Sequence, residues 1–547
     1  MQISLMKVII ILLLSFQLVA YPQDFKKLFS KEEIFGTLEI LGNDSLNGRG
    51  TGTEGEEMAA NYISAELKKI NILPLGINNT YFQYIPLIGS IPLKSSKLIL
   101  NNREENYKLN LNDDYLMYTG GEQTFIPNSI PLVFVGYGII APEFDYNDYQ
   151  SVDVRGKIAV MLSGEPVSDD PDFFYGKTET IYSRPDAKQR LAISRGSSGS
   201  IIIPYSEHWT NYMWENFKKK FSFENVILPY NAADNLSILF NPAKAGVLFL
   251  NSGYNLEDIY KMDKNSGMRS FPLKVELSFN GNFKEREFVS KNVIGMIEGN
   301  DPNLKDSYLI ISAHYDHLGI GPAVKGDSIY NGVQDNAMGV AAVLQLAKIL
   351  KQNQKMLKRS VVFLFLTGEE KGLIGSGYYT AHPVVPLYKT IADINIDGVA
   401  VFDEFNSIIG VGTEFSTLDK FFRKTADVLG LKIGKIPGIF DMADAFYLSD
   451  QLSFALAGIP SIITMDGIDY KHISKEEGIQ KFINYSENVY HTPFDDFNQE
   501  INLDAAIEHI NFLYELSLNL LNSEETPEWN EGVPFIDARL RSIAEQK

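Results

Sequence analysis

The sequence from Asn292 onward alternates short apolar runs with longer stretches of helical periodicity, and this pattern limits the fold more than any other feature. Strands are predicted over residues 308–312, 360–366, 390–396 and 459–464, with a helix such as 337–350 between them. Nearly continuous apolar strands are buried on both faces, which is typical of α/β sheets covered by helices. The sequence therefore predicts an α/β fold with a mixed, mainly parallel sheet and helices on both faces.

Acidic and histidine side chains follow the ends of these predicted elements. They lie in five segments: HYDH (314–317), GVQDNAMG (332–339), TGEEKG (367–372), NIDG (395–398) and YHTPFDD (490–496). Ligands of open α/β sheets bind beyond the carboxyl ends of the strands. We therefore expect the five segments to supply one site, whose reaction class would be metal-assisted hydrolysis.

Two imidazoles and three carboxylates in these segments make a ligand set for two divalent cations. The predicted ligands are His314, Asp335, Glu370, Asp397 and His491. Because the chain has no cysteine, thiolate ligands and disulfides are excluded. If Asp335 bridges, each of two Zn²⁺ ions has three protein ligands and shares a water, which leaves coordination open for substrate.

Two further carboxylates are predicted to act beside the metals. Glu369 is the candidate general base, because Glu370 would point to the metal while its neighbour faces the cavity. Asp316, two residues after His314, is suited to accept the second ring proton of that histidine and to fix its tautomer. The other histidines are given structural roles, because each lacks a second ligand at usable spacing: His208, His317, His382, His472 and His509.

At these residues the chain resembles the co-catalytic zinc exopeptidases, which include bacterial leucyl aminopeptidases and glutamate carboxypeptidase II. The family patterns HYDHLG, GADDNASG, EExGLxGS, NxDM and YHTPxD align with residues 314–319, 332–339, 369–376, 395–398 and 490–495. The resemblance implies that His314, Asp335 and Asp397 hold one zinc, and that Asp335, Glu370 and His491 hold the other. It also implies that Glu369 is the general base.

The chain departs from the family pattern at several positions. Gln334 replaces the first Asp of the ADD pattern, whereas the ligand position Asp335 is intact. Gln451 stands where relatives usually carry His or Tyr, and an amide supplies neither a phenol nor a charged imidazole to a tetrahedral oxyanion. Tyr447 is the alternative donor in the sequence.

The middle of the chain, residues 97–275, changes to short β-type runs separated by turns. It resembles the protease-associated (PA) domain inserted in these enzymes, with VFVGYGIIAP (133–142) and VDVRGKIAVML (152–162) as its signatures. The predicted division is a signal peptide over 1–20, a peptidase domain over 21–96 and 276–525, a PA-like domain over 97–275 and a tail over 526–547.

The net charge of the chain and the pattern at its N-terminus limit where the protein is located and what it binds. A net charge of -20 argues against nucleic acids and anionic membrane surfaces as partners. Lys7 precedes an apolar run over 8–14, which is a secretory signal pattern, and no later segment approaches the roughly 20 apolar residues of a membrane span. We expect an exported protein, periplasmic or secreted, without stable membrane insertion.

The first functional hypothesis is an exported di-zinc aminopeptidase acting on peptides. Three alternatives stay open: a carboxypeptidase of the glutamate carboxypeptidase type, a non-catalytic receptor-like protein on the same scaffold, and glutaminyl cyclisation on a single zinc. The first alternative needs cationic groups for a substrate carboxylate, and Lys371 is the nearest in sequence. The oligomeric state stays open.

Overall fold

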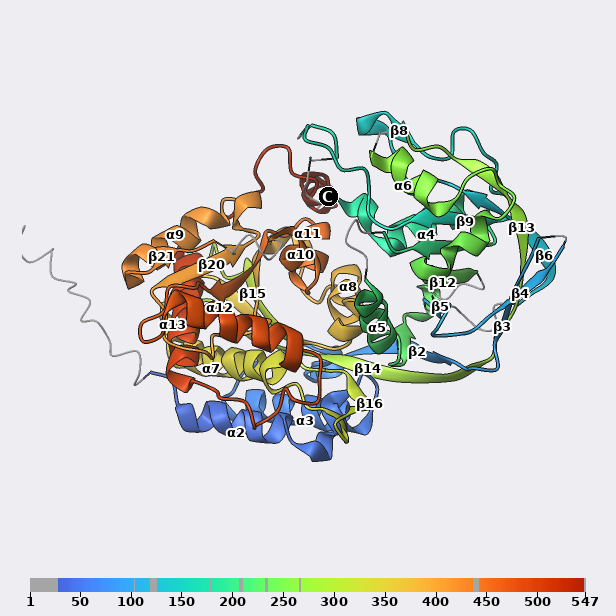
Figure 1. Ribbon diagram of the computed structural model, residues 1–547. Helices are drawn as coiled ribbons and strands as arrows, with labels where there is room; N and C mark the ends of the chain where they lie inside the picture. The colour runs from blue at the N-terminus through green and yellow to red at the C-terminus, as the bar shows by residue number, and fades with distance from the viewer. Residues whose placement is uncertain are drawn as a thin grey trace, which may run out of the picture.

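The computed structural model describes residues 28–102, 104–118, 125–170, 172–174, 176, 180–205, 210–231, 235–264, 267–435 and 442–545. The predicted signal peptide (1–20) and His208 lie outside these residues. Figure 1 shows two lobes joined by two long strands, β2 (Phe82–Pro92) and β14 (Phe283–Ile297). These strands pair in antiparallel register, with Phe82 opposite Val293 and Pro92 opposite Phe283.

The first lobe is built on a sheet with a parallel centre. Four neighbouring strands, in the order β18 (Ser360–Leu366), β15 (Tyr308–His314), β19 (Thr390–Asn395) and β22 (Ser461–Asp466), run parallel. The outer positions are β11 (Asn225–Ile227), β2 and β14 on one side, β20 (Ser407–Val411) and β21 (Lys432–Ile433) on the other, and β1 (Leu73–Pro74) on β14. Since β14 joins β18, and β20 joins β22, in antiparallel pairs, the sheet is mixed and parallel only in part.

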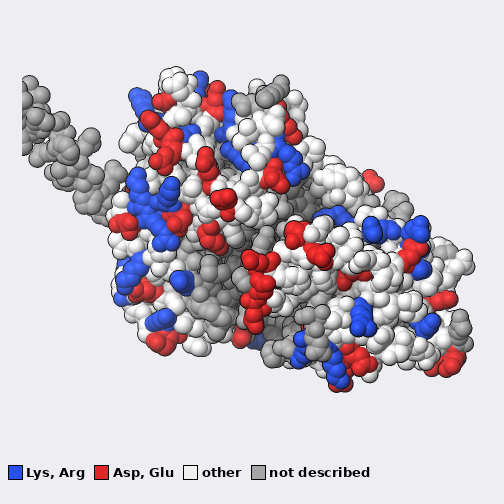
Figure 2. Space-filling model, turned by 90° about the horizontal axis from the view of Figure 1, so that it is seen from above, with Lys and Arg blue, Asp and Glu red and all other residues white. Residues whose placement is uncertain are grey.

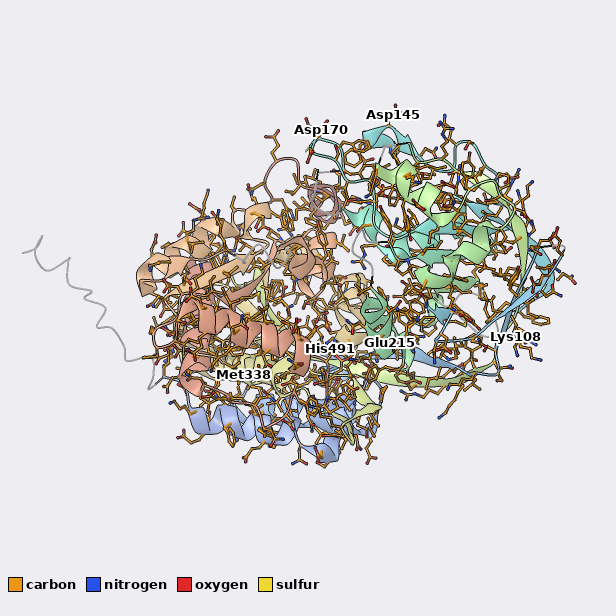
Figure 3. The ribbon with its side chains drawn as sticks, in the orientation of Figure 1. Lys108, Asp145, Asp170, Glu215, Met338 and His491 are labelled. Carbon is orange, nitrogen blue, oxygen red and sulfur yellow. The ribbon has the colours of Figure 1, made fainter. Side chains whose placement is uncertain are left out.

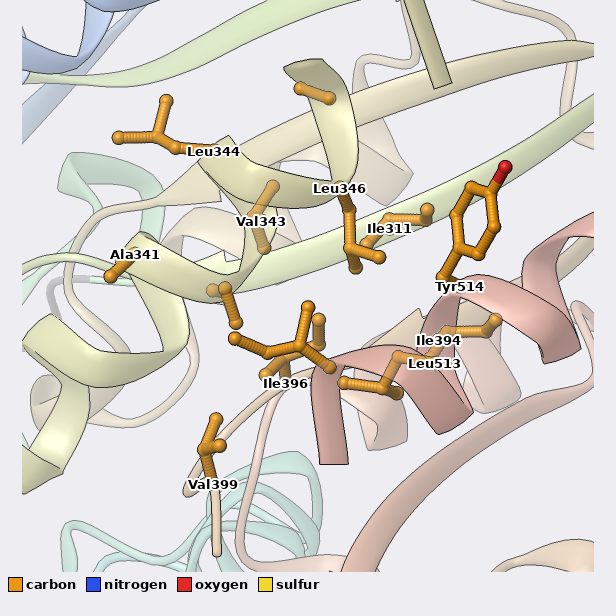
Figure 4. Close-up of a cluster of buried hydrophobic side chains, with 14 of the residues drawn as sticks. Ile311, Ala341, Val343, Leu344, Leu346, Ile394, Ile396, Val399, Leu513 and Tyr514 are labelled. Atoms are coloured by element: carbon orange, nitrogen blue, oxygen red, sulfur yellow. The ribbon is translucent and has the colours of Figure 1, made fainter. Parts of the chain in front are cut away.

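Alternate residues of the central strands face opposite cores, as the period of two in a β-strand requires. On β15, Leu309 and Ile311 belong to the larger core, whereas Ile310 belongs to a smaller core on the other face. Figure 4 shows part of the larger core, where Ile311 and Ile394 of the sheet meet side chains of two covering helices. The predicted α/β class with helices on both faces is thereby confirmed.

The helices divide between these two faces. Side chains of the larger core come from α2 (Lys31–Leu41), α3 (Glu54–Lys69), α7 (Met338–Gln352), α9 (Leu418–Leu429) and α13 (Leu503–Asn522). The smaller core receives Tyr379 of α8 (Ile374–Ala381) and Phe454 of α11 (Gln451–Leu456). Further helices are α10 (Met442–Tyr447), α12 (Lys475–Asn484) and α14 (Ile536–Ala544), the last in the predicted tail.

The second lobe contains a sheet of its own. Its strands, in spatial order, are β4 (Asn106–Leu109), β3 (Lys97–Asn101), β13 (Phe271–Asn280), β6 (Phe125–Phe134), β9 (Ile158–Leu162), β10 (Gly199–Ile203), β12 (Leu236–Phe240) and β5 (Tyr115–Met117). Helices α4 (Pro185–Ser194), α5 (Asn211–Lys220) and α6 (Leu256–Lys264) accompany it. The expected boundary at 275/276 falls inside β13, which stays in this sheet through Asn280 because it pairs with β3 and β6.

The surface carries charges of both signs. Figure 2 shows basic and acidic side chains interspersed over the face seen from above. Within the described ranges, no helix combines the length and the hydrophobicity needed to cross a membrane.

Candidate metal centre

Three neighbouring parallel strands carry predicted site residues to one edge of the sheet. β15 ends at His314, and Asp397 lies two residues beyond the end of β19. After β18, the left-handed Gly368 (φ 65°) turns the chain into a short helix that begins with Glu369 and Glu370. Because β18, β15 and β19 are adjacent and parallel, these side chains meet at their carboxyl ends.

Two loops bring the remaining predicted ligands to the same edge. Asp335 lies in the turn Val333–Ala337 that precedes α7. Its backbone N–H and that of Gln334 donate to the two carboxylate oxygens of Asp495, each at 2.9 Å. His491 follows the turn Tyr485–Val489, and Figure 3 shows it on the side of the first lobe that faces the second lobe.

The two carboxylate oxygens of Asp335 lie against two different imidazoles. Oδ1 is 3.2 Å from Nε2 of His314, and that nitrogen is also 3.2 Å from Oδ1 of Asp397. Oδ2 is 3.1 Å from Nε2 of His491, which is 3.2 Å from Oε2 of Glu370. The structure thus brings all five predicted ligands together in two sets that share Asp335.

These distances fit divalent cations. Ligand bonds of about 2.0–2.1 Å in a tetrahedral site put neighbouring donor atoms about 3.3 Å apart. The donor separations of 3.1–3.2 Å in both sets are close to that value. The imidazole and carboxylate donors are also those that zinc accepts, so the residues present fit metal ions of this kind.

The electrostatics of the cluster favour cations. Burial works against charge on the His491 ring, but the carboxylates of Glu370 and Asp335 raise its pKa to about 10. Burial also opposes charge on the His314 ring, yet Asp397 and Glu369 raise its pKa well above the ordinary value. The same carboxylates would stabilise divalent ions, which displace protons from histidine ligands when they bind.

Exposure differs across the cluster. The side chains of His314, Asp335 and Glu370 are buried, whereas those of His491 and Asp397 are 36% and 22% exposed. The cluster is therefore open to solvent at His491 and Asp397.

Glu369, the predicted base, is held beside the two sets by its backbone. Its N–H donates to Oδ1 of Asp316 at 3.2 Å. Burial raises the pKa of Glu369 well above its ordinary value, and the carboxylates of Asp397 and Glu370 add to this effect.

Asp316 makes contacts that differ from the expected one. Nδ1 of His314 lies 3.2 Å from the backbone carbonyl oxygen of Asp316 and 3.9 Å from its carboxylate, so the carbonyl is the hydrogen-bond partner. The carboxylate instead accepts from the Thr51 hydroxyl at 2.9 Å and from the Glu369 N–H. Asp316 therefore orients His314 through its main chain and Glu369 through its side chain.

His317 corrects the prediction that it lacks a second ligand at usable spacing. Its Nδ1 lies 2.7 Å from Oε1 of Glu370 and 3.9 Å from Oδ2 of Asp335, a grouping that could hold a metal ion. In the sequence, the one sign of a possible ligand role for His317 is its position three residues after His314.

Arg49 is a further residue of the site that the sequence interpretation missed. It is fully buried and donates to the carbonyls of Leu41, Tyr315, Asn331 and Gly332 at 2.5–2.9 Å. Burial lowers its pKa to about 10. It links the Gly-rich segment 46–55 to the loops that carry His314 and Asp335.

Gln451 is occupied by contacts within the fold. Its amide oxygen accepts from Nδ2 of Asn395 at 2.8 Å, and its amide nitrogen donates to the carbonyls of Ala445 and Phe446. The side chain thus braces the end of β19, two residues before Asp397. Tyr447, the alternative oxyanion donor, ends α10 and packs its ring against Phe446.

Other histidines have structural partners, as the sequence predicts. His509 accepts from the Ala400 N–H and contacts the Thr464 hydroxyl, and His472 pairs with Asp403 at 2.9 Å. The ring of His382 lies against that of Tyr378.

Comparisons with known proteins find similarity to peptidases. Residues 292–516 match the model "Peptidase family M28". The chain is 30% identical over 261 residues to a probable leucine aminopeptidase 2 of Aspergillus oryzae, which is 45% of this chain and 47% of that protein. It is 31% identical over 138 residues to a vacuolar membrane protease of Candida dubliniensis, covering 25% of this chain and 13% of that protein. The chain thus spans about half of the first relative and less of the second.

A solved structure shares the fold over nearly the whole chain. An aminopeptidase from Aneurinibacillus sp. strain AM-1 superposes with a TM-score of 0.52 and 18% sequence identity, covering 93% of this chain and 96% of that one. Because the sequence identity is only 18%, this likeness shows a shared fold, which includes both lobes, and nothing further.

Proposed function

We propose that this chain, whose residues 292–516 belong to peptidase family M28, is an exported di-zinc aminopeptidase that removes N-terminal residues from peptides. The observation that carries the proposal is the position of Asp335, whose two carboxylate oxygens lie 3.1–3.2 Å from two different histidines. A carboxylate shared in this way is suited to bridge two ions.

The proposed ligands follow from the two sets. His314, Asp335 and Asp397 would hold one zinc, and Asp335, Glu370 and His491 would hold the other. Two zinc ions, when bound, would lower the pKa of a water between them and polarise the scissile carbonyl.

Glu369 is the proposed general base and then the general acid. Its carboxylate takes a proton from the attacking water and returns it to the leaving amine. The Asp316 carboxylate supports this role, because it fixes the backbone N–H of Glu369 at 3.2 Å. A carboxyl whose pKa is raised by burial is also a better proton acceptor than an ordinary one.

The charges around the site favour a substrate ammonium over a substrate carboxylate. Two nearby arginines are already engaged: Arg49 donates to four carbonyls, and Arg286 binds Glu224 and the carbonyls of Thr51 and Gly52. Lys371 lies 5.4 Å over the Phe223 ring, and burial lowers its pKa. These contacts support aminopeptidase over carboxypeptidase action.

The second lobe is proposed to be a PA-like inserted domain that shapes access to the site, extending through Asn280 because β13 stays in its sheet. The connection from α5 of this lobe to β11 of the first lobe's sheet lies close to the proposed site, since Phe223 packs against Tyr330 at 5.0 Å and Glu224 pairs with Arg286. Export to the periplasm or the medium is proposed from the N-terminal pattern of the sequence.

Blocked peptides test the choice of terminus. The zinc-loaded protein is incubated with one apolar peptide in three forms: free at both ends, acetylated at the N-terminus, and amidated at the C-terminus. We expect loss of cleavage with the acetylated form only, because acetylation removes the ammonium. Loss with the amidated form only would overturn aminopeptidase action in favour of a carboxypeptidase.

A further inference from the structure

His317 is a buried histidine whose ring makes no hydrogen bond to the described residues. It is 0% exposed, and within the described part of the chain neither ring nitrogen has a hydrogen-bond partner. Leaving a buried polar group unsatisfied costs about 1–3 kcal/mol, and native proteins seldom leave one so. A partner other than a protein side chain is therefore expected at this ring.

The atoms around His317 indicate what that partner is. Nδ1 lies 2.7 Å from Oε1 of Glu370, but the two atoms lack the alignment of a hydrogen bond, and Oε1 has no other such partner among the described residues. Nδ1 is also 3.9 Å from Oδ2 of Asp335. These are the carboxylates that His491 contacts at 3.1 and 3.2 Å. Two imidazoles thus converge on one carboxylate pair, with ring centroids 5.7 Å apart.

The His317 ring is held in this position by the fold. Its backbone N–H donates to the carbonyl oxygen of Arg49 at 3.2 Å. Gly332 leaves the room that the ring occupies, because a Cβ at that position would lie 2.5 Å from Cγ of His317. A side chain that is fixed before a ligand arrives loses little entropy when it binds.

We propose that His317 is a fourth protein ligand of the second metal position, beside Asp335, Glu370 and His491. This inference rests on the proposed two-metal function. The first position then has three protein ligands, His314, Asp335 and Asp397, and keeps open coordination, whereas the second is nearly closed. The second position therefore holds its ion more tightly, and the ion at the first position exchanges more readily.

Stepwise removal of zinc tests the inference. Wild type, His317→Ala and the control His382→Ala, an exposed histidine, are loaded with zinc and dialysed against rising concentrations of a chelator, and the zinc per chain is measured. Wild type and the control should lose one ion first and keep the second. In His317→Ala, the affinity for the second ion should fall by about 10–100-fold or more, so that both ions leave together.

The outcomes separate this inference from the proposed function. A His317→Ala protein that keeps its second ion to the same chelator concentration as wild type would overturn the ligand role alone. A wild-type protein that binds no zinc would overturn the two-metal function and the inference with it.

A measurement on the unchanged protein covers the case in which His317→Ala does not fold. Wild type is loaded with one equivalent of zinc, which occupies the tighter position, and X-ray absorption counts the imidazoles bound to it. The inference predicts two imidazoles per zinc, from His317 and His491. One imidazole per zinc would contradict it.

Discussion

At the scale of the residue, Asp316 joins the proposed metal ligand His314 to the proposed base Glu369. Its carbonyl oxygen accepts from the His314 ring, while its carboxylate accepts from Thr51 and from the Glu369 N–H. Burial raises the pKa of this carboxyl, and its two hydrogen bonds, from Thr51 and from the Glu369 N–H, offset part of the cost of burying it. The side chain therefore acts as a positioning group that never needs to touch the substrate.

Replacing Asp316 by Ala should weaken zinc binding by about 10–100-fold, because the Glu369 N–H that loses its acceptor directly precedes the proposed ligand Glu370, and outer partners of a metal site contribute to affinity on this scale. The change leaves the Thr51 hydroxyl and the Glu369 N–H without their acceptor. Competition with a chromophoric chelator measures the affinity. The control is Asp496→Ala, since that carboxylate binds Asn498 instead. Wild-type zinc affinity in Asp316→Ala would remove the positioning role.

That the five predicted ligands meet at one place could be predicted from sequence, because each lies beside an apolar strand or helix signal. The partners of individual atoms could not. Whether the carbonyl or the carboxylate of Asp316 meets His314 depends on the turn after β15, and no pattern of residue types encodes that choice. His317 was misjudged for the same reason, since its ring reaches Glu370 only across two loops.

At the scale of the element, α13 is tied to the sheet by a buried histidine. Nδ1 of His509 accepts from the Ala400 N–H at 3.1 Å, and Nε2 lies 2.8 Å from the Thr464 hydroxyl of β22. Burial lowers the pKa of His509 from 6.5 to about 3, so the folded protein keeps this ring neutral.

The stability of the fold should therefore depend on pH through His509. Between about pH 6.5 and about pH 3, the unfolded chain binds a proton that the folded chain does not, so the free energy of unfolding falls as the pH falls. His509→Asn removes this titration. The stability advantage of wild type over the variant should shrink by about 2 kcal/mol from about pH 7 to about pH 5, measured by urea unfolding. An advantage that does not change with pH would contradict a neutral buried ring.

The bounds of two strands show where sequence periodicity is sufficient to predict an element and where it is not. Residues 360–366 were predicted as a strand and form β18 with the same bounds, because both faces of the run are apolar and buried. The end of the second lobe was placed at 275, inside β13. Alternation continues through Asn280, and strand pairing rather than composition decides to which sheet a long strand belongs.

At the scale of the whole molecule, the two lobes share strands and side-chain contacts close to the site. β2 and β14 join the sheets, and Arg286 on β14 binds Glu224, which lies between α5 and β11, together with the carbonyls of Thr51 and Gly52. Thr51 and Gly52 belong to the Gly-rich segment 46–55. Arg49 and Thr51 of this segment contact the loops of the candidate metal centre. A short segment near the N-terminus, residues 49–52, therefore connects Arg286 of the shared strand β14 to the loops of the proposed site, and such long-range contacts leave no periodic signal in sequence.

The central claim is that the five-ligand cluster is a two-metal hydrolytic centre with Glu369 as its base. The most direct test compares wild type with Glu369→Gln, measuring zinc per chain and peptide turnover on the same samples. We predict two zinc ions in both proteins and a turnover reduced by about 10²–10⁴-fold in the variant, because the amide fills the same space but takes no proton. Wild-type turnover in a zinc-loaded Glu369→Gln protein, or fewer than two zinc ions in the active wild type, would contradict the claim.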